Sequence, residues 1–129
     1  MWGQCSPHPA NSHTEGLMHR GKDCYDVLRD VVKERARQEE LKEAGKFKYG
    51  CDSPGLSDPE KYTILGEEFG EVGHEVNELF NLRNSGRDID WSIVKMYREK
   101  LRKELIQVAA VAVAWVEGLD AEAAGEKAS

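Results

Sequence analysis

Glutamates are concentrated in the stretch GEEFGEVGHEVNELF at residues 66–80, which contains no Lys or Arg. Glu68, Glu71, Glu75 and Glu78 follow one another at steps of three or four residues, the spacing that aligns side chains on one face of an α-helix, where like charges repel. Hard cations such as Mg²⁺ bind neighbouring carboxylates and keep further ligand positions for water and phosphate. The stretch is therefore either a solvated acidic face or part of a divalent-metal site.

A second acidic position lies in the segment KELIQVAAVAVAW, where Glu104 comes just before an apolar run. A carboxylate at the margin of a core needs a partner, and glutamates from two facing helices are a recurrent way to build a metal site in a helical bundle. Gly70 and Gly73 lie inside the acidic helix, where each costs about 1 kcal/mol relative to Ala. We therefore expect something to approach this helix closely, and both features favour a metal site.

The two segments EEFGE and ELIQVAAVAVAW resemble the E-x-x-E … E-x-x-D signature of the MazG-like all-α nucleotide pyrophosphohydrolases, whose helical carboxylates hold Mg²⁺. The resemblance extends over about residues 23–119. It matches Glu68 and Glu71 to the first half of the signature and Glu104 to the first position of the second half. The chain departs from the pattern at Gln107, which stands where the family has Asp and offers an amide oxygen without a charge.

The resemblance implies hydrolysis of a nucleoside triphosphate between the α and β phosphates, to a monophosphate and pyrophosphate, with Mg²⁺ or Mn²⁺ as the cofactor. Such an ion lowers the pKa of an attacking water while a neighbouring Glu accepts its proton. The proton acceptor, or a further ligand, is expected among Glu67, Glu75 and Glu78, and Lys100 either steers phosphates or pairs with Glu104. The expected metal ligands are Glu68, Glu71, Glu78, Glu104 and Gln107.

Two other functions stay open at this point. One is a noncatalytic helical oligomer of the same ancestry that binds a nucleotide or a protein partner, which the departure at Gln107 favours. The other is an acidic interaction module without a metal, which leaves the two glycines and Glu104 unexplained. Phe47 and Tyr49, in the connecting loop, either stack on a base or close the core.

Three helices are predicted to position these residues, and no segment shows the sustained alternation of a half-buried strand. Their boundaries are set by caps and turn residues. The first helix is expected between Asp23 and Gly45. The second is expected between the Ser57–Glu60 capping box and the turn at 84–86, and the third between Asp88 or Asp90 and Gly118. The predicted fold class is all-α, with one helical domain at 22–119 between a disordered arm (1–21) and a flexible tail (120–129).

The third predicted helix implies an assembly of several chains. It is about 28 residues or about 42 Å long, and its second half, VAAVAVAW at residues 108–115, is apolar on nearly every face. Such a segment needs close helix neighbours on several sides, and three helices from one chain can hardly supply them. We therefore expect a homodimer or homotetramer that buries this run between its subunits.

Composition limits the remaining alternatives. A chain of 129 residues with a net charge of −6 is the size of one domain and does not suit a general nucleic-acid binder. Its three cysteines form no C-x-x-C pair, which fits a reducing cytoplasm. The apolar run at 108–116 is shorter than the roughly 20 residues that span a bilayer. His8, His13 and His19 match no common metal-ligand spacing.

Overall fold

The computed structural model describes residues 23–46 and 50–128, so the predicted arm with its three histidines, and Phe47 and Tyr49, lie outside the described residues. The described chain forms α1 (Cys24–Glu43), α2 (Asp58–Arg83) and α3 (Trp91–Ala128) and contains no strand. The predicted all-α class is therefore confirmed. None of these three helices is long and apolar enough to cross a membrane.

The helix starts follow the local signals in the sequence. The Asp23 carboxylate accepts a hydrogen bond of 2.9 Å from a backbone N–H in the first turn of α1. Ser57 and Glu60 form the predicted capping box before α2. At the start of α3, the Asp90 carboxylate accepts a hydrogen bond of 2.9 Å from a backbone N–H of the first turn. Of the two predicted caps, Asp90 and not Asp88 therefore caps this helix. These contacts satisfy N–H groups that have no partner inside the helix.

The predicted helix ends are confirmed at two of three positions. Gly45 follows α1 with a φ of +74°, and Gly86 lies in the α2–α3 turn with a φ of +69°, a backbone region that glycine enters without steric cost. The expected end of the third helix at Gly118 is wrong, since α3 continues to Ala128. A Cβ at position 118 would lie 3.2 Å from both the Cys51 carbonyl oxygen and Lys61 Nζ. Gly118 therefore allows close packing and does not end the helix.

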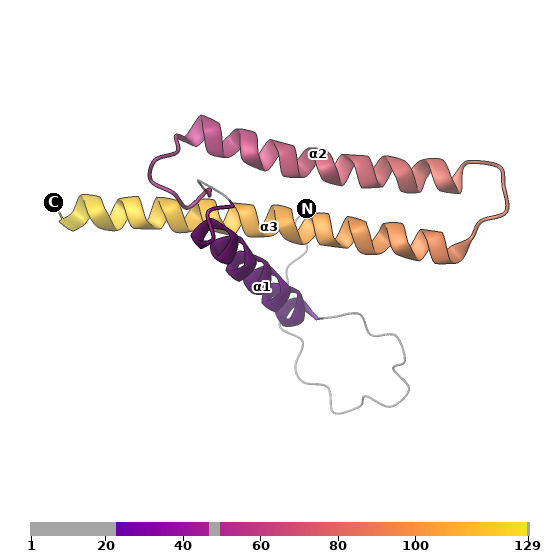
Figure 1. Ribbon diagram of the computed structural model, residues 1–129, viewed down its shortest axis with the longest axis horizontal. Coiled ribbons are helices and arrows are strands. Elements are labelled where there is room, and N and C mark those ends of the chain that lie inside the picture. The colour runs from indigo at the N-terminus through magenta and orange to yellow at the C-terminus, as the bar shows by residue number, and fades with distance from the viewer. Residues whose placement is uncertain (1–22, 47–49, 129) are drawn as a thin grey trace, which may run out of the picture.

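Helices α2 and α3 lie side by side and antiparallel, and α1 crosses α3 at an angle (Figure 1). The C-terminal part of α3 extends past the start of α2. Near this end, Trp115 Nε1 donates a 3.1 Å hydrogen bond to Asp58 Oδ1 and so ties α3 to the first turn of α2. The α2–α3 pair places residues from the middle of α2 opposite residues from the middle of α3.

A small core lies where the α1–α2 loop meets the α2–α3 pair. Cys51, Val111 and Ala114 are buried together, and Ala110 is fully buried as well. The expectation that the whole run 108–115 is buried between subunits is therefore wrong for the three α3 residues, which this chain covers by itself. Their side chains are small, so the other helices and the loop approach α3 closely enough to exclude water.

Candidate metal site and the adjoining cavity

Three of the predicted metal ligands meet between the paired helices. Glu68 and Glu71 on α2 and Glu104 on α3 each contribute a carboxylate oxygen, and these oxygens lie within 4.8 Å of one another. Glu68 and Glu104 are half-buried, whereas Glu71 is exposed. The three residues are called the carboxylate triad below. Its position at the surface of the α2–α3 contact leaves one side open to solvent through Glu71.

Two oxygens of the carboxylate triad lack hydrogen-bond donors. Glu68 Oε2 and Glu104 Oε2 are buried with no hydrogen-bond partner among the described residues, and Glu75 Oε2 on α2 is in the same condition. An unsatisfied buried carboxylate oxygen costs free energy that a cation or a donor would recover. Oxygen ligands from neighbouring carboxylates are what Mg²⁺ binds in proteins. The residues present therefore fit a divalent cation.

Burial and like charge both raise the pKa values of two members of the carboxylate triad, Glu68 and Glu104. Burial raises the pKa of Glu68, and the charges of Glu71, Glu34 and Glu67 raise it further. Burial also raises the pKa of Glu104, and the Glu71 carboxyl adds to the effect through a hydrogen bond and its charge. Full ionisation is therefore unfavourable in the protein alone, and a bound cation would reverse this because opposite charge favours the ionised form.

The other predicted site residues occupy different positions, and their roles stay predictions. Glu75 and Glu78 are half-buried on α2, whereas Glu67 is exposed. Lys100 is exposed and its ammonium lies 5.3 Å from the centre of the Tyr97 ring. Gln107 lines a cavity that Glu68 also lines. Glu75 is thus the only one of the five with a buried, unpartnered oxygen among the described residues.

That cavity has a volume of about 150 Å³ and lies between α1, the α1–α2 loop, α2 and α3. Glu68 belongs both to its wall and to the carboxylate triad. Val111 and Ala114 supply an apolar floor, and Gln38 faces the cavity from α1 as Gln107 does from α3. A ligand group in the cavity would therefore meet amide donors and acceptors next to a potential cation site.

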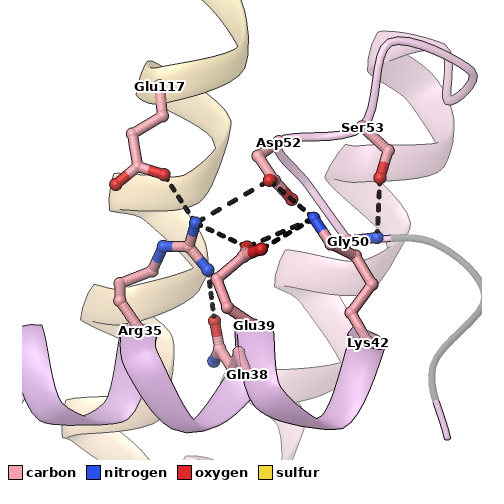
Figure 2. A network of polar contacts seen from close by, with 8 residues as sticks. All are labelled: Arg35, Gln38, Glu39, Lys42, Gly50, Asp52, Ser53 and Glu117. Carbon is pink, nitrogen blue, oxygen red and sulfur yellow. Dashed lines mark hydrogen bonds and ion pairs between the residues drawn. The ribbon is translucent and has the colours of Figure 1, made fainter. Parts of the chain in front are cut away.

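A network of charges holds the α1 wall of this cavity (Figure 2). Arg35 Nη2 contacts Glu117 Oε2 on α3 at 2.5 Å and Glu39 Oε1 at 3.0 Å, and it lies 3.9 Å from Asp52 Oδ2. Lys42 Nζ donates to Asp52 Oδ2 at 2.9 Å and contacts Glu39 Oε2 at 3.0 Å. The network therefore links α1 both to α3 and to the loop.

Contacts within this network also shift the pKa values of two of its members. Burial opposes ionisation of Asp52, but hydrogen bonds and charge from Lys42 outweigh burial and lower its pKa. In the same way, hydrogen bonds from Arg35 to Glu117 and Glu39 outweigh burial and raise the pKa of Arg35. Both shifts favour the charged forms of Asp52 and Arg35, whereas the raised pKa values of Glu68 and Glu104 disfavour theirs.

Sequence reasoning missed the α1 side of the site. Arg35, Gln38, Glu39 and Lys42 follow one another at steps of three, one and three residues, which is one helix face. A stripe of both charge signs is a weak signal, since it also describes an ordinary solvated face. Nothing in the sequence indicated a role for Asp52, because it meets Lys42 only through the course of the α1–α2 loop in the folded chain.

No other part of the described chain approaches Gly70 or Gly73 closely, so the expectation of a close contact at these glycines stays a prediction. A Cβ added at either glycine would meet nothing within 4 Å. Both are exposed on α2. The glycines therefore give no support to a ligand held close to the α2 backbone by this chain alone.

Neither the models of known protein families, nor curated proteins, nor solved structures gave a match to this chain. The function is therefore inferred from the residues of the site.

Proposed function

We propose that the protein is a Mg²⁺-dependent nucleoside triphosphate pyrophosphohydrolase, which converts a ribo- or deoxyribonucleoside triphosphate to the monophosphate and pyrophosphate. The observation that carries the proposal is the carboxylate triad, in which Glu68, Glu71 and Glu104 converge from two helices. Two of its oxygens are buried without a hydrogen-bond donor in the part of the chain that the structure describes. These are the residues that the resemblance to the MazG-like signature matches. The same residues are thus selected by sequence pattern and by geometry.

The chain's own residues have two tasks at the reacting phosphates, which are to hold the cation and to accept a proton. The carboxylate triad would hold a divalent cation, which, when bound, would neutralise phosphate charge and lower the pKa of a water. Water then adds to phosphorus, the bond between the α and β phosphates breaks, and the water proton passes to a carboxylate. Glu75 is the best-placed acceptor, because it lies on the same helix face as Glu68 and Glu71 and its Oε2 is buried with no partner among the described residues. Glu67 and Glu78 are the alternatives.

The cavity beside Glu68 supports a place for the nucleoside part of the substrate. Its volume of about 150 Å³ is below the roughly 300–1,000 Å³ of pockets that enclose a whole drug-sized ligand. It suits one group of the substrate, such as the base, while the charged phosphates extend toward the carboxylate triad. Gln38 and Gln107 would then hydrogen-bond the group that enters.

The direct experiment is pyrophosphate release from a panel of ribo- and deoxyribonucleoside triphosphates, with Mg²⁺, with Mn²⁺ and with a chelator. We expect release from at least one nucleotide that requires the metal. An absence of release from every nucleotide with either metal would contradict the proposal.

A second candidate is a noncatalytic nucleotide- or protein-binding module, which the neutral side chain of Gln107 favours. Gln107→Asp separates the two. If Glu75 already supplies the missing charge, the change should leave Mg²⁺ affinity nearly unaltered, and a Glu75→Gln, Glu78→Gln double variant should weaken it. We expect this result. A large gain in Mg²⁺ affinity and the appearance of turnover only in Gln107→Asp would favour the noncatalytic module.

The proposal includes a homo-oligomer, as the length of α3 leads us to expect. It is supported by large hydrophobic side chains that this chain leaves exposed on α2 and α3.

A further inference from the structure

Among the described residues, three cationic side chains line the cavity beside the carboxylate triad, and they are Arg35, Arg37 and Lys42. Arg35 and Lys42 are engaged in the network that joins α1 to α3 and to the loop, and their side chains are 11% and 27% exposed. The Arg37 side chain is 49% exposed and pairs with one acid on its own helix, Glu34. Arg37 is therefore the cation of the cavity wall that can bind a ligand without breaking a contact between helices.

Glu34 holds the guanidinium of Arg37 in one orientation. Arg37 Nε donates to Glu34 Oε2 at 2.8 Å, and Arg37 Nη2 donates to Glu34 Oε1 at 2.6 Å, which is the paired geometry of a bidentate contact. The Glu34 side chain is itself only 12% exposed. The remaining nitrogen, Arg37 Nη1, makes no hydrogen bond to a described residue. An arginine held in this way has two N–H groups left for an anion and needs little further ordering to bind one.

Arg37 also lies near the acidic end of the cavity, because Glu68 of the carboxylate triad lines the same cavity. The hydrogen bonds to Glu34 raise the pKa of Arg37, burial opposes this shift, and the charges of Glu34 and Glu68 add to it. Burial and neighbouring acids raise the pKa of Glu68, and the charge of Arg37 opposes them. The guanidinium and the predicted metal ligand are thus close enough for their charges to interact.

A nucleoside triphosphate at the carboxylate triad would need more positive charge than one divalent cation supplies. The triad contributes three carboxyl groups, and the charges of Glu34 and Glu67 also act on Glu68. Phosphate oxygens carry further negative charge into this site, so like charges would repel one another there. A guanidinium is well suited to offset this repulsion, since its planar set of N–H donors matches the oxygens of a phosphate.

The position of Arg37 on the cavity wall indicates which phosphate it would meet. The proposed function places the nucleoside group of the substrate in the cavity and the phosphates toward the triad. The α-phosphate is bonded to the nucleoside, so it is the phosphate that stays closest to the cavity wall. The β- and γ-phosphates lie further along the chain of phosphates and leave together as pyrophosphate.

We propose that Arg37 binds the α-phosphate of the substrate through Nη1, with its guanidinium held by Glu34. This inference rests on the proposed function, because it needs the nucleoside group in the cavity and the cation on the carboxylate triad. The same contact is available to the monophosphate product, which keeps the α-phosphate. Pyrophosphate lacks that phosphate and would not use Arg37.

Binding of the two products tests the inference without turnover. Isothermal titration calorimetry with Mg²⁺ present would measure the affinities for a panel of ribo- and deoxyribonucleoside monophosphates and, separately, for inorganic pyrophosphate. Arg37→Met should raise the dissociation constant of the bound monophosphate by about tenfold or more and change that of pyrophosphate by less than about twofold. Arg37→Lys keeps the charge but loses the planar set of donors, so its affinity for the monophosphate should lie between those of the parent and Arg37→Met.

Arg29→Met is the matched control. Arg29 is also exposed on α1 and pairs at 2.8 Å with an acid three residues before it, Asp26, but it lies outside the cavity lining. This variant should bind both products as the parent does. In pyrophosphate release, Arg37→Met should raise KM for the nucleotide more than it lowers kcat, because the contact is made in the bound substrate as well as in the transition state. Mg²⁺ affinity without nucleotide should not fall, since the change removes a positive charge near Glu68.

The outcomes separate this inference from the proposed function. If the parent releases pyrophosphate and Arg37→Met matches Arg29→Met in product binding and in KM, Arg37 does not bind the substrate and only this inference fails. Equal weakening of monophosphate and pyrophosphate binding would also overturn it, because that result shows a general effect of charge. A parent that neither hydrolyses any nucleotide nor binds any monophosphate would overturn both.

Discussion

A carboxylate oxygen of Glu71 on α2 and one of Glu104 on α3 lie within 4.8 Å of each other, although the second half of α2, a turn and the first third of α3 separate the two residues in the chain. The antiparallel pairing of α2 and α3 creates this contact, and Glu68 completes it from the next turn of α2. Because the pairing must hold three acidic groups together, the stability of the protein should respond to anything that binds or neutralises them.

Removing one carboxylate of the triad should abolish stabilisation by metal. In the parent protein, Mg²⁺ at about 100 times its dissociation constant should add about 2.7 kcal/mol to the free energy of unfolding. In Glu104→Gln this gain should fall close to zero, while the metal-free variant should be as stable as the parent or more so, since one repulsion is lost. The Tm with and without Mg²⁺ measures both effects. An equal Mg²⁺-induced rise in Tm for both proteins would exclude Glu104 as a ligand.

The raised pKa values of Glu68 and Glu104 predict an unusual pH dependence for the metal-free protein. A carboxyl whose pKa is raised by folding favours the folded state when it is protonated. This contribution is complete below the ordinary carboxyl value near 4.5 and is lost as the pH rises through the raised pKa.

Between neutral pH and that range, acidification should therefore stabilise the parent relative to a Glu68→Gln, Glu104→Gln variant. Chemical denaturation of both proteins at several pH values, with a chelator present, measures the difference. Affinity for Mg²⁺ should fall over the same interval, because protons compete for the same oxygens. A difference in stability that is constant with pH would contradict the assignment.

Arg35 and Arg37, both on α1, allow a matched comparison of a largely buried and an exposed arginine. The Arg35 side chain is 11% exposed and bridges α1 to Glu117 of α3, whereas Arg37 is 49% exposed and pairs with Glu34 on its own helix. Arg35→Met should reduce the free energy of unfolding by about 1–3 kcal/mol, since it breaks charge-assisted hydrogen bonds and leaves acids unpaired. Arg37→Met should cost less than about 1 kcal/mol. Urea denaturation compares the two, and equal losses would show that the bridge to α3 contributes nothing.

Gly118 and Gly125, both inside α3, allow a second matched comparison. A Cβ at 118 would lie 3.2 Å from the Cys51 carbonyl oxygen, whereas a Cβ at 125 would meet nothing within 4 Å. Gly125→Ala should stabilise the protein by up to about 1 kcal/mol through helix propensity. Gly118→Ala should destabilise it, because the loop that carries Cys51 must move. Thermal unfolding gives the sign of each change, and a gain in both variants would contradict the close packing at 118.

How far the sequence predicts this protein depends on how local each signal is. Asp23 and Ser57 predict the starts of α1 and α2, and the spacing of Glu68 and Glu71 predicts that they share a helix face. Glu104 was expected beside them from its position before the apolar run and from the resemblance to the MazG-like signature, not from spacing. The role of Gly118 depends on Cys51 and Lys61, which reach it only through tertiary packing, so a sequence rule for helix ends misplaced it. The Arg35 network was not predictable for the same reason, since Asp52 and Glu117 are distant in the chain.

The most direct test of the central claim is Mg²⁺-dependent pyrophosphate release by the parent protein, by Glu71→Gln and by the control Glu99→Gln. Glu71 belongs to the carboxylate triad, whereas Glu99 is exposed on α3 and lies outside both the triad and the cavity lining. With a hydrolysed nucleotide, we expect Glu99→Gln to retain the parent rate and Glu71→Gln to lose about a hundredfold or more in rate while remaining helical by circular dichroism. Parent-like release by Glu71→Gln, at the same Mg²⁺ concentration, would show that the carboxylate triad is not the catalytic site.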